Sequence, residues 1–262
     1  MTVQAFLDQA FLDKVSNKSA RIGVIGLGYV GLPLALACLK AGFRVTGYDI
    51  DGAKIAALTA ERSYLPHIPV DGIGTQIAAG DFLPTDRIAD LGTADAVLIC
   101  VPTPLTPERD PDLRYVRDTA AALTPALKPG ALVVLESTTY PGTTDEVLRP
   151  VLEASGRTVG TDLFLAFAPE REDPGNQNYS IGRIPKVVGG VDEASGKLAV
   201  ALYSAVLEKV VPVSSAATAE AVKITENVFR AVNIALVNEL KVIYGAMDID
   251  VWEVIEAAST KP

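Results

Sequence analysis

The sequence predicts an α/β fold in which helices cover both faces of a parallel sheet and one long helix follows the sheet. Between residues 21 and 189, short and nearly continuous apolar runs such as 96–101 alternate with helical patterns. Strands of this composition are typical of parallel sheets that are buried on both faces. The segment 214–245 carries the longest helical pattern of the chain. Hydrophobic residues make up 49% of the 262 residues, which is enough for a substantial core.

The elements are expected in a regular order along the chain. A short amphipathic helix within residues 1–20, with Phe6, Leu7, Ala10 and Phe11 on its apolar face, precedes the first strand. Strands are expected at 21–26, 43–49, 85–88, 96–101, 131–136, 163–167 and 185–189. Helices are expected at 29–41, 52–60, 73–80, 113–127 and 143–154, with a loop rich in Pro and Gly at 63–74. Gly42 is placed to cap the end of the helix at 29–41.

The strongest local motif is a glycine pattern between the first strand and the helix that follows it. Gly26 would permit a tight turn, Gly28 would let the backbone approach a pyrophosphate, and Gly31 would let the helix pack closely on the strand. The N-terminus of that helix would offer free N–H groups to phosphates. Turn glycines before a helix are common, so the pattern gains weight only from its context. That context predicts a Rossmann-type doubly wound parallel sheet.

A carboxylate follows at the distance that dinucleotide-binding units use. Asp49 ends the second strand, 21 residues after Gly28, and could accept both ribose hydroxyls of an adenosine. It would repel a 2′-phosphate, so the pattern predicts NAD rather than NADP as the cofactor. The alternative is that Asp49 merely caps the next helix, but Asp51 is the better cap and leaves Asp49 for the ribose.

Composition excludes several kinds of partner. The net charge of −9 argues against nucleic acid and anionic membranes, because both bind basic faces. No apolar run is long enough to span a membrane, and residues 1–20 lack the pattern of a signal peptide. Cys38 and Cys100, the two cysteines, both lie in apolar elements, which suits a reducing compartment, and we expect the cytoplasm. No metal site is expected.

Polar residues gather where the predicted strands end, which is the edge at which such sheets bind ligands. The four segments are Asp49, Val101–Pro104, Glu136–Thr144 and Phe167–Asn176. Each could be an ordinary turn, but four at one edge indicate a site. A phosphorylated substrate would be repelled by the net charge, so it would need local basic groups. The candidates are Lys54, Arg171, Arg183, Lys186 and Lys223.

The long helical pattern at 214–245 is apolar on two faces, so it needs more than one surface to bury them. We expect it to span two domains or two subunits, and we expect a homodimer. Lys223 and Asn227 stand four residues apart and share a face, although the spacing alone favours a solvated helix face. The expected parts are an N-terminal extension at 1–19, a cofactor-binding domain at 20–213, and a central helix with the start of a further domain at 214–262.

Four segments together carry a family resemblance: GLGYVGLPLA, ESTTYPGTT, APEREDPGN followed by IPKVVGG, and AEAVKITEN. With them, residues 20–262 resemble the UDP-glucose/GDP-mannose dehydrogenase family, and most closely its bacterial UDP-N-acetyl-hexosamine 6-dehydrogenases. The resemblance implies an NAD-dependent oxidation of the C6 alcohol of a UDP-sugar to a carboxylate, through an aldehyde and a cysteine thioester. A UDP-sugar such as UDP-N-acetylglucosamine is therefore the expected substrate.

The resemblance also implies roles for individual residues. Glu170 would be the general base, Thr138 would help to hold the hydrolytic water, and Arg171 and Glu172 would contact substrate and cofactor. Lys223 would stabilise the oxyanion that forms at C6, and Asn227 would orient the same oxygen. The expected cofactor contacts are Gly26, Gly28, Tyr29, Val30, Gly31, Asp49, Lys54, Val101, Pro102, Thr103, Thr138 and Glu172.

The expected nucleophile is missing from the sequence. In the family it lies in a glycine-rich segment beyond the central helix, and residues 257–262 do not reach such a segment. Cys38 and Cys100 are expected to be core residues, and His67 is expected to be a loop residue rather than a base. The resemblance thus implies an N-terminal fragment that is inactive alone. The alternatives are a non-catalytic module for NAD binding and dimerisation, or a β-hydroxyacid-type dehydrogenase.

Overall fold

The computed structural model describes residues 2–66, 68–171 and 184–261. By its internal contacts the chain divides into two compact units, Met1–Ala221 and Val222–Pro262, and each is considered by itself. The strands are β1 (Arg21–Ile25), β2 (Arg44–Tyr48), β3 (Phe82–Thr85), β4 (Ala96–Ile99), β5 (Ala131–Leu135), β6 (Leu163–Phe167), β7 (Lys186–Gly190) and β8 (Val210–Pro212). The α-helices are α1 (Val3–Ser16), α2 (Gly31–Lys40), α3 (Gly52–Thr59), α4 (Ile73–Ala79), α5 (Arg114–Leu123), α6 (Arg149–Glu153), α7 (Glu193–Ser204), α8 (Ala216–Ala246) and α9 (Val251–Ala258).

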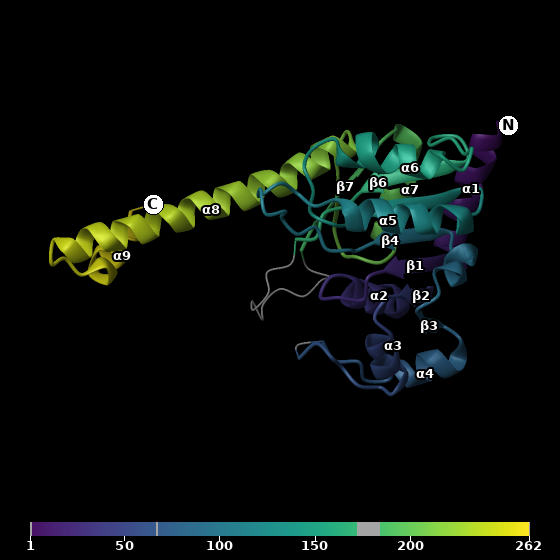
Figure 1. Ribbon diagram of the computed structural model, residues 1–262, viewed down its shortest axis with the longest axis horizontal. Helices are drawn as coiled ribbons and strands as arrows, with labels where there is room; N and C mark the ends of the chain where they lie inside the picture. The colour runs from purple at the N-terminus through teal and green to yellow at the C-terminus, as the bar shows by residue number, and fades with distance from the viewer. Residues whose placement is uncertain (1, 67, 172–183, 262) are drawn as a thin grey trace. The chain divides into compact units, whose positions relative to one another are not determined.

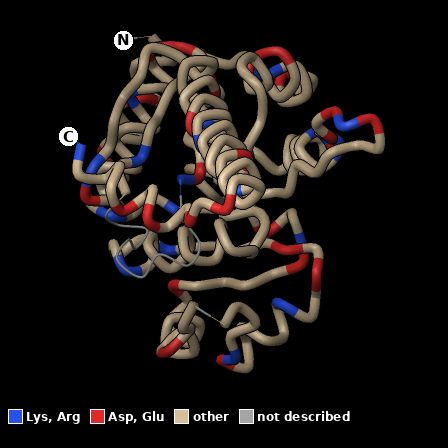
Figure 2. The backbone as a smooth tube through the Cα atoms, turned by 90° about the vertical axis from the view of Figure 1, so that its left-hand side faces the viewer, with Lys and Arg blue, Asp and Glu red and all other residues tan. Residues whose placement is uncertain are grey.

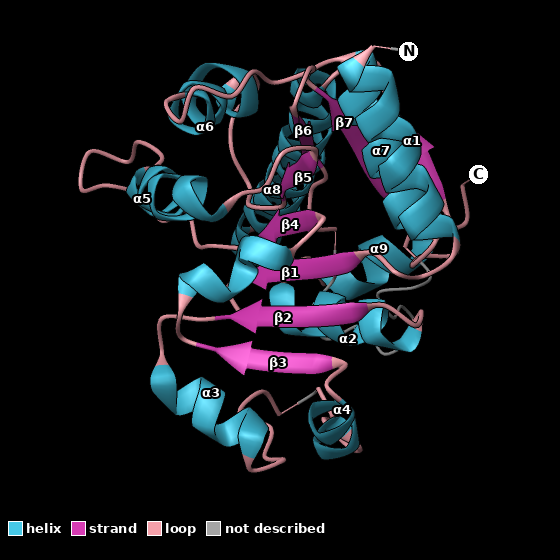
Figure 3. Ribbon diagram, turned by 90° about the vertical axis from the view of Figure 1, so that its right-hand side faces the viewer, coloured by secondary structure: helices cyan, strands magenta, loops and turns pink. Residues whose placement is uncertain are grey.

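The first unit is built on one eight-stranded sheet with the order β3-β2-β1-β4-β5-β6-β7-β8 (Figure 1). All neighbours from β3 to β6 are parallel, which is the order of a doubly wound sheet. Every residue of β4, β5 and β6 is buried, as the continuous apolar runs predict. Figure 3 shows α1, α2 and α7 on one face of the sheet and α5 and α6 on the other. The predicted fold class is therefore confirmed.

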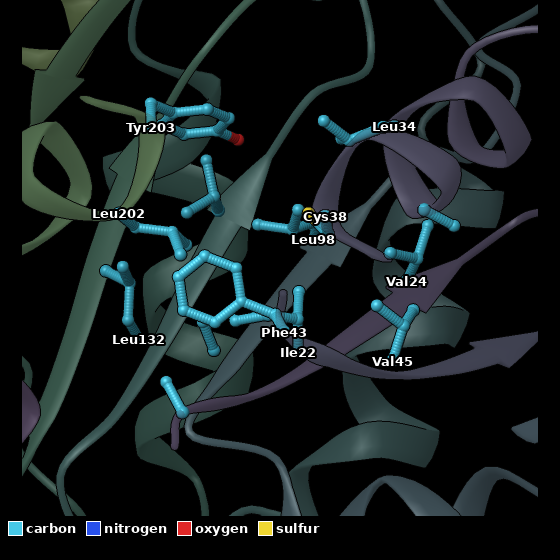
Figure 4. Packing of buried hydrophobic residues seen from close by; sticks show 14 of the residues in the cluster. Ile22, Val24, Leu34, Cys38, Phe43, Val45, Leu98, Leu132, Leu202 and Tyr203 are labelled. Carbon is cyan, nitrogen blue, oxygen red and sulfur yellow. The ribbon is translucent and has the colours of Figure 1, made fainter. Parts of the chain in front are cut away.

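The core beneath α2 and α7 determines where the glycine turn lies. Ile22, Val24 and Leu98 project from the sheet toward Leu34 and Cys38 of α2 (Figure 4). These side chains are at most 4% exposed. Each buried side chain of this size contributes about 1.5–3 kcal/mol through the hydrophobic effect. The core thus holds the first turn of α2 close to the carboxyl end of β1.

Several predicted elements differ from the structure. The strand expected at 85–88 is β3, at Phe82–Thr85, and a 3₁₀ helix (η1, Ile88–Thr93) occupies part of the predicted range. The helix expected at 113–127 ends at Leu123 and continues as a 3₁₀ turn (η2, Thr124–Ala126), because Pro125 has no N–H to donate. In the helix expected at 143–154, a π-helical turn (η3, Thr143–Leu148) precedes α6, since Pro150 cannot donate to residue 146.

Other differences concern the edges of the unit. β7 pairs antiparallel with β6, although a parallel sheet was expected throughout. No element was predicted for α7, β8 or α9, although Asp192 and Asp250 cap α7 and α9 by accepting backbone N–H groups. Phe6, expected on the buried face of the N-terminal helix, is 62% exposed, whereas Phe11 is buried. No described helix has both the length and the apolar character that crossing a membrane requires.

Figure 2 shows Lys and Arg interspersed with Asp and Glu along the described backbone. One cluster of these charges anchors α1 at the amino end of the sheet. Asp95 precedes β4, and its carboxylate receives Lys14 of α1 at 2.8 Å and Lys128 at 2.7 Å. The backbone N–H of Arg21 donates to the second oxygen at 2.9 Å. Burial alone raises the pKa of Asp95, but the hydrogen bonds from Lys128, Lys14 and Arg21 outweigh it and lower the pKa below its ordinary value.

Replacing Asp95 with Ala should destabilise the fold by about 1.5–3 kcal/mol at pH 7, because hydrogen bonds to a buried charge are lost. A carboxyl whose pKa is lower in the folded state stabilises above its unfolded pKa, and this contribution is lost as the pH falls through the folded pKa. The difference between wild type and Asp95→Ala should therefore shrink below about pH 4. Urea unfolding over this pH range measures it, with the exposed Asp118→Ala as the control. An equal loss for both variants would contradict the assignment.

Candidate functional site

A cleft of about 710 Å³ lies at the carboxyl ends of the central strands, within the first unit. Its size is typical of sites that hold a small molecule or cofactor. Most of the residues that line it lie at or after the carboxyl ends of β1, β2, β4, β5 and β6, so strands far apart in the sequence supply one site. The predicted site residues among them are Gly26, Gly28, Tyr29, Val30, Asp49, Lys54, Val101, Pro102, Thr103, Thr138 and Glu170.

The glycine turn between β1 and α2 forms one wall of the cleft. Gly26 has a φ of +88°, and a Cβ there would lie 2.5 Å from the carbonyl oxygen of Cys100. At Gly31 a Cβ would lie 1.9 Å from the carbonyl oxygen of Gly26. At Gly28, by contrast, a Cβ would meet no described atom within 4 Å. Two glycines are thus required by packing, and the third leaves open space in the cleft beside the N-terminus of α2, a shape that fits a pyrophosphate.

Asp49 is 5% exposed and holds the turn in place. Its Oδ2 accepts the N–H of Leu27 at 2.8 Å and the Nζ of Lys54 at 2.8 Å. Its Oδ1 accepts the N–H of Asp51 at 3.0 Å. Asp51 in turn caps α3 by accepting the N–H of Ala53 at 2.9 Å, so the prediction that Asp51 is the helix cap is confirmed. Asp49 remains at the cleft, where its oxygens can accept ribose hydroxyls as well.

Two hydroxyls tie the loops after β4 and β5 together at the floor of the cleft. Thr103 donates from Oγ1 to the carbonyl oxygen of Thr138 at 2.7 Å. Ser137 donates from Oγ to the carbonyl oxygen of Val101 at 2.6 Å. Together these bonds hold Thr103 and Thr138 at adjacent positions along the cleft.

Comparison with known proteins agrees with this geometry. Residues 20–207 match the NAD binding domain of the UDP-glucose/GDP-mannose dehydrogenase family, and residues 217–262 match its central domain. The chain belongs to this family. Its first unit contains the NAD-binding domain, which the glycine turn and Asp49 fit.

The similar proteins act on nucleotide sugars. The chain is 37% identical to a UDP-N-acetyl-D-mannosamine dehydrogenase of Pyrococcus horikoshii over 92% of its own length and 58% of that protein. It is also 37% identical to a UDP-N-acetyl-D-glucosamine 6-dehydrogenase of Pseudomonas aeruginosa, over 93% of this chain and 57% of that protein. The chain therefore spans just under three fifths of the length of these relatives.

Solved structures show the same relationship. The structure of a UDP-D-ManNAc dehydrogenase from Pyrococcus horikoshii superposes with a TM-score of 0.86 at 37% identity, covering 92% of this chain and 58% of that one. A 3-hydroxyisobutyrate dehydrogenase from Mycobacterium tuberculosis reaches a TM-score of 0.64 at 18% identity, over 92% and 70% of the two chains. The second likeness shows a shared fold alone.

A buried ionic cluster adjoins the cleft. Glu136 and Lys186 were each expected near the site, but their pairing was not predicted from the sequence. Glu136, the residue after β5, is 1% exposed and lines the cleft. Its carboxylate forms an ion pair with Lys186 and accepts the hydroxyl of Tyr203. Burial, and then the charge of Glu136, raises the pKa of Tyr203 well above its ordinary value, so the hydroxyl remains a donor. The position of Glu136 directly after the apolar strand β5 is the sequence feature that indicates a buried carboxylate in need of a partner.

A second buried glutamate joins α8 to the loop after β5. Glu220 is fully buried and accepts the N–H groups of Gly142 at 2.6 Å and Thr144 at 2.9 Å. The hydroxyl of Thr144 donates to the same carboxylate at 2.7 Å. Burial raises the pKa of Glu220, although these hydrogen bonds act against the rise. The first turn of α8 is thereby fixed to the loop that also carries Thr138.

The other predicted residues have different positions. Arg171 donates from Nη1 to the carbonyl oxygen of Pro185 at 2.7 Å and lines a cavity of about 40 Å³ that Glu170 and Glu136 share. Lys223 and Asn227 lie on α8, in the second unit. Two of the suggested basic groups have acidic partners, since Lys54 pairs with Asp49 and Lys186 with Glu136. Glu172, His67 and Arg183 lie outside the described residues.

The two cysteines differ in their burial, although both were expected in the core. Cys38 is buried in the core, as predicted, and burial raises the pKa of its thiol to about 12. Cys100 was expected inside a buried strand, but β4 ends at Ile99, and Cys100 is partly exposed at the cleft. Desolvation, followed by the charge of Glu136, raises the pKa of Cys100 well above its ordinary value. Neither thiol is set up to ionise near neutral pH.

Two alanine substitutions should separate the packing role of the glycines from their binding role. Gly31→Ala should cost at least about 3 kcal/mol of stability, since the backbone leaves no space for a Cβ. Gly28→Ala should change the free energy of unfolding by less than about 1 kcal/mol. It should nevertheless weaken NAD binding at least about tenfold, because the new methyl group lies where the pyrophosphate would approach. Chemical denaturation and calorimetric titration measure both, and unchanged NAD affinity in Gly28→Ala would contradict the placement.

Proposed function

We propose that the chain supplies the cofactor site of a nucleotide-sugar 6-dehydrogenase that oxidises the C6 alcohol of a UDP-N-acetyl-hexosamine. The observation that carries this proposal is the single cleft that contains Asp49, Thr138 and Glu170. It brings together, at one edge of the sheet, a carboxylate that we propose accepts the ribose hydroxyls and a carboxylate that we propose is the base. The similarity to dehydrogenases of UDP-N-acetyl-D-mannosamine and UDP-N-acetyl-D-glucosamine supports the substrate class. Which of the two sugars is bound is left open by this proposal.

In the proposed mechanism, the first oxidation removes a proton and a hydride from the C6 alcohol. Glu170 is the general base that accepts the proton, and NAD would supply the hydride acceptor when bound. Thr138 helps to hold the hydrolytic water of the later hydrolysis. Lys223 stabilises the negative charge that develops on the C6 oxygen, and Asn227 donates a hydrogen bond to the same oxygen. Arg171 and Glu172 are proposed substrate and cofactor contacts. These roles rest on the motifs that the chain shares with its family.

The second oxidation in this mechanism requires a thiolate that attacks the aldehyde. Cys38 is enclosed by the core and Cys100 has a strongly raised pKa, so neither suits this role. We therefore propose that the 262-residue chain by itself does not complete the oxidation.

Incubating the purified chain with NAD and UDP-N-acetylglucosamine, or its mannosamine epimer, should yield no uronic acid. Product analysis by mass spectrometry and NADH absorbance measure the outcome, and calorimetry confirms that NAD is bound. In parallel, iodoacetamide should alkylate Cys38 and Cys100 far more slowly in the folded chain than in urea. Formation of two NADH per sugar would contradict the proposal and would return Cys100 to consideration as the nucleophile.

Cofactor selectivity should depend on Asp49. Asp49→Ala should weaken NAD binding by on the order of 1–3 kcal/mol, because hydrogen bonds to a charged group are lost. The preference for NAD over NADP should shrink at the same time, since the carboxylate no longer opposes a 2′-phosphate. Asp51→Ala serves as the control, because it removes the neighbouring carboxylate that caps α3. Equal affinity of the wild type for the two cofactors would refute this assignment.

We also propose a homodimer formed through α8. The part of α8 in the second unit exposes a row of large apolar side chains, among them Val228, Phe229, Val232, Leu236 and Val242, each more than half exposed. A patch of this kind is typical of a subunit interface, and a two-fold axis would pair it with itself.

Light scattering at micromolar concentration should show a dimer, and Phe229→Lys should shift the chain toward monomer because a charge enters the apolar contact. Lys241→Glu on the same helix provides the control, since helical periodicity places Lys241 on the opposite side of α8 from this apolar row. A monodisperse monomer of the unaltered chain would contradict the dimer.

A further inference from the structure

One peptide of the glycine turn is held from both sides. Leu27 lies between Gly26 and Gly28, and its side chain is fully buried. Its N–H donates to Oδ2 of Asp49 at 2.8 Å. Its carbonyl oxygen accepts the hydroxyl of Tyr64 at 2.6 Å. The first bond comes from the residue at the end of β2, and the second comes from the loop after α3, to which no function has been assigned.

The second bond has a direct geometric consequence. The carbonyl of Leu27 and the N–H of Gly28 belong to one planar trans peptide, so they point in opposite directions. Fixing the carbonyl toward Tyr64 therefore fixes the N–H of Gly28 away from it. Gly28 has no side chain to restrict its own backbone, and glycine loses more conformational freedom on ordering than any other residue. A restraint on this peptide thus reduces its conformational freedom before binding. Less conformational entropy is then lost when a pyrophosphate binds.

Tyr64 is well placed to provide that restraint. Its ring packs against the hydrophobic core, together with Leu65 and Ile68 from the same loop. The hydroxyl oxygen of Ser63 lies 2.8 Å and 2.7 Å from the carbonyl oxygens of Leu65 and Ile68, so its one proton is shared between two acceptors of the same loop. Burial, and then the charges of Asp49 and Asp51, raises the pKa of Tyr64, so its hydroxyl stays protonated and remains a donor.

We propose that Tyr64 is a positioning residue for the cofactor: its hydroxyl orients the Leu27–Gly28 peptide so that the turn is ready to receive the pyrophosphate of NAD. Asp49 and Tyr64 then act as a pair, one on each polar group of Leu27. The proposal rests on NAD binding in the cleft and does not depend on which sugar is oxidised. Tyr64 differs in this role from the residues that would touch the cofactor, because Tyr64 acts through the backbone of the turn.

The test compares Tyr64→Phe with the wild type and with Tyr244→Phe, a tyrosine on α8 that is not among the residues lining the cleft. Affinities for ADP-ribose, which contains the pyrophosphate, are measured by calorimetry. Affinities for adenosine, which lacks it, are measured by ligand-detected NMR. Tyr64→Phe should bind ADP-ribose about three- to tenfold more weakly, the effect of losing one hydrogen bond. It should bind adenosine as the wild type does, and Tyr244→Phe should bind both ligands normally.

The outcomes separate positioning from a purely structural role. Amide exchange of Gly28 measured by NMR should become faster in Tyr64→Phe, with the exchange of β4 and β5 unchanged. Equal weakening for adenosine and ADP-ribose would show that Tyr64 only supports the fold and would overturn the proposal. Unchanged binding of ADP-ribose by Tyr64→Phe would overturn it as well. Failure of the wild type to bind ADP-ribose would instead refute the cofactor site, and the proposal with it.

Discussion

The close approach of the β1–α2 turn to the end of β4 is the constraint on which the rest of the site depends. A Cβ at Gly26 or Gly31 would overlap backbone carbonyl oxygens of Cys100 or of Gly26 itself. Because neither residue has one, α2 can pack down on the sheet and direct its N-terminus toward the cleft. The space left beside Gly28 is a consequence of that packing. The wall of the cleft at the glycine turn is therefore a product of core packing.

Two acidic residues, Asp49 and Glu136, are buried at this edge of the sheet, and each has hydrogen-bonding and cationic partners that offset the cost of burying its charge. Asp49 receives Lys54 and two backbone N–H groups, and Glu136 receives Lys186 and Tyr203. Leaving such a carboxylate unpaired would cost several kcal/mol, so the partners are part of the architecture. Because these acidic groups are already paired, the net charge of −9 is compatible with an anionic ligand at this edge, where the N-terminus of α2 offers backbone N–H groups.

Local patterns predicted the sheet and the cleft well, because both depend on short-range rules. Continuous apolar runs identified β1, β4, β5 and β6, and the glycine pattern with Asp49 identified two segments that line the cleft. Features that depend on distant partners could not be predicted in this way. Examples are the antiparallel pairing of β7 with β6, the ion pair between Glu136 and Lys186, and the bond from Tyr64 to Leu27. Each joins segments more than 20 residues apart. Nothing in the local sequence distinguishes Tyr64 from an ordinary loop tyrosine. The end of α5 before Pro125, by contrast, could have been predicted from the sequence, because proline has no N–H to donate.

A crystal structure of the chain with NAD would test the central claim most directly, namely that the packed glycine turn and Asp49 form the cofactor site. The account predicts the pyrophosphate against residues 26–31 and the adenosine ribose hydroxyls within hydrogen-bond distance of the Asp49 carboxylate. It also predicts that the nicotinamide end points toward Thr138 and Glu170. Cofactor density at another edge of the sheet, or a ribose that does not contact Asp49, would contradict the account.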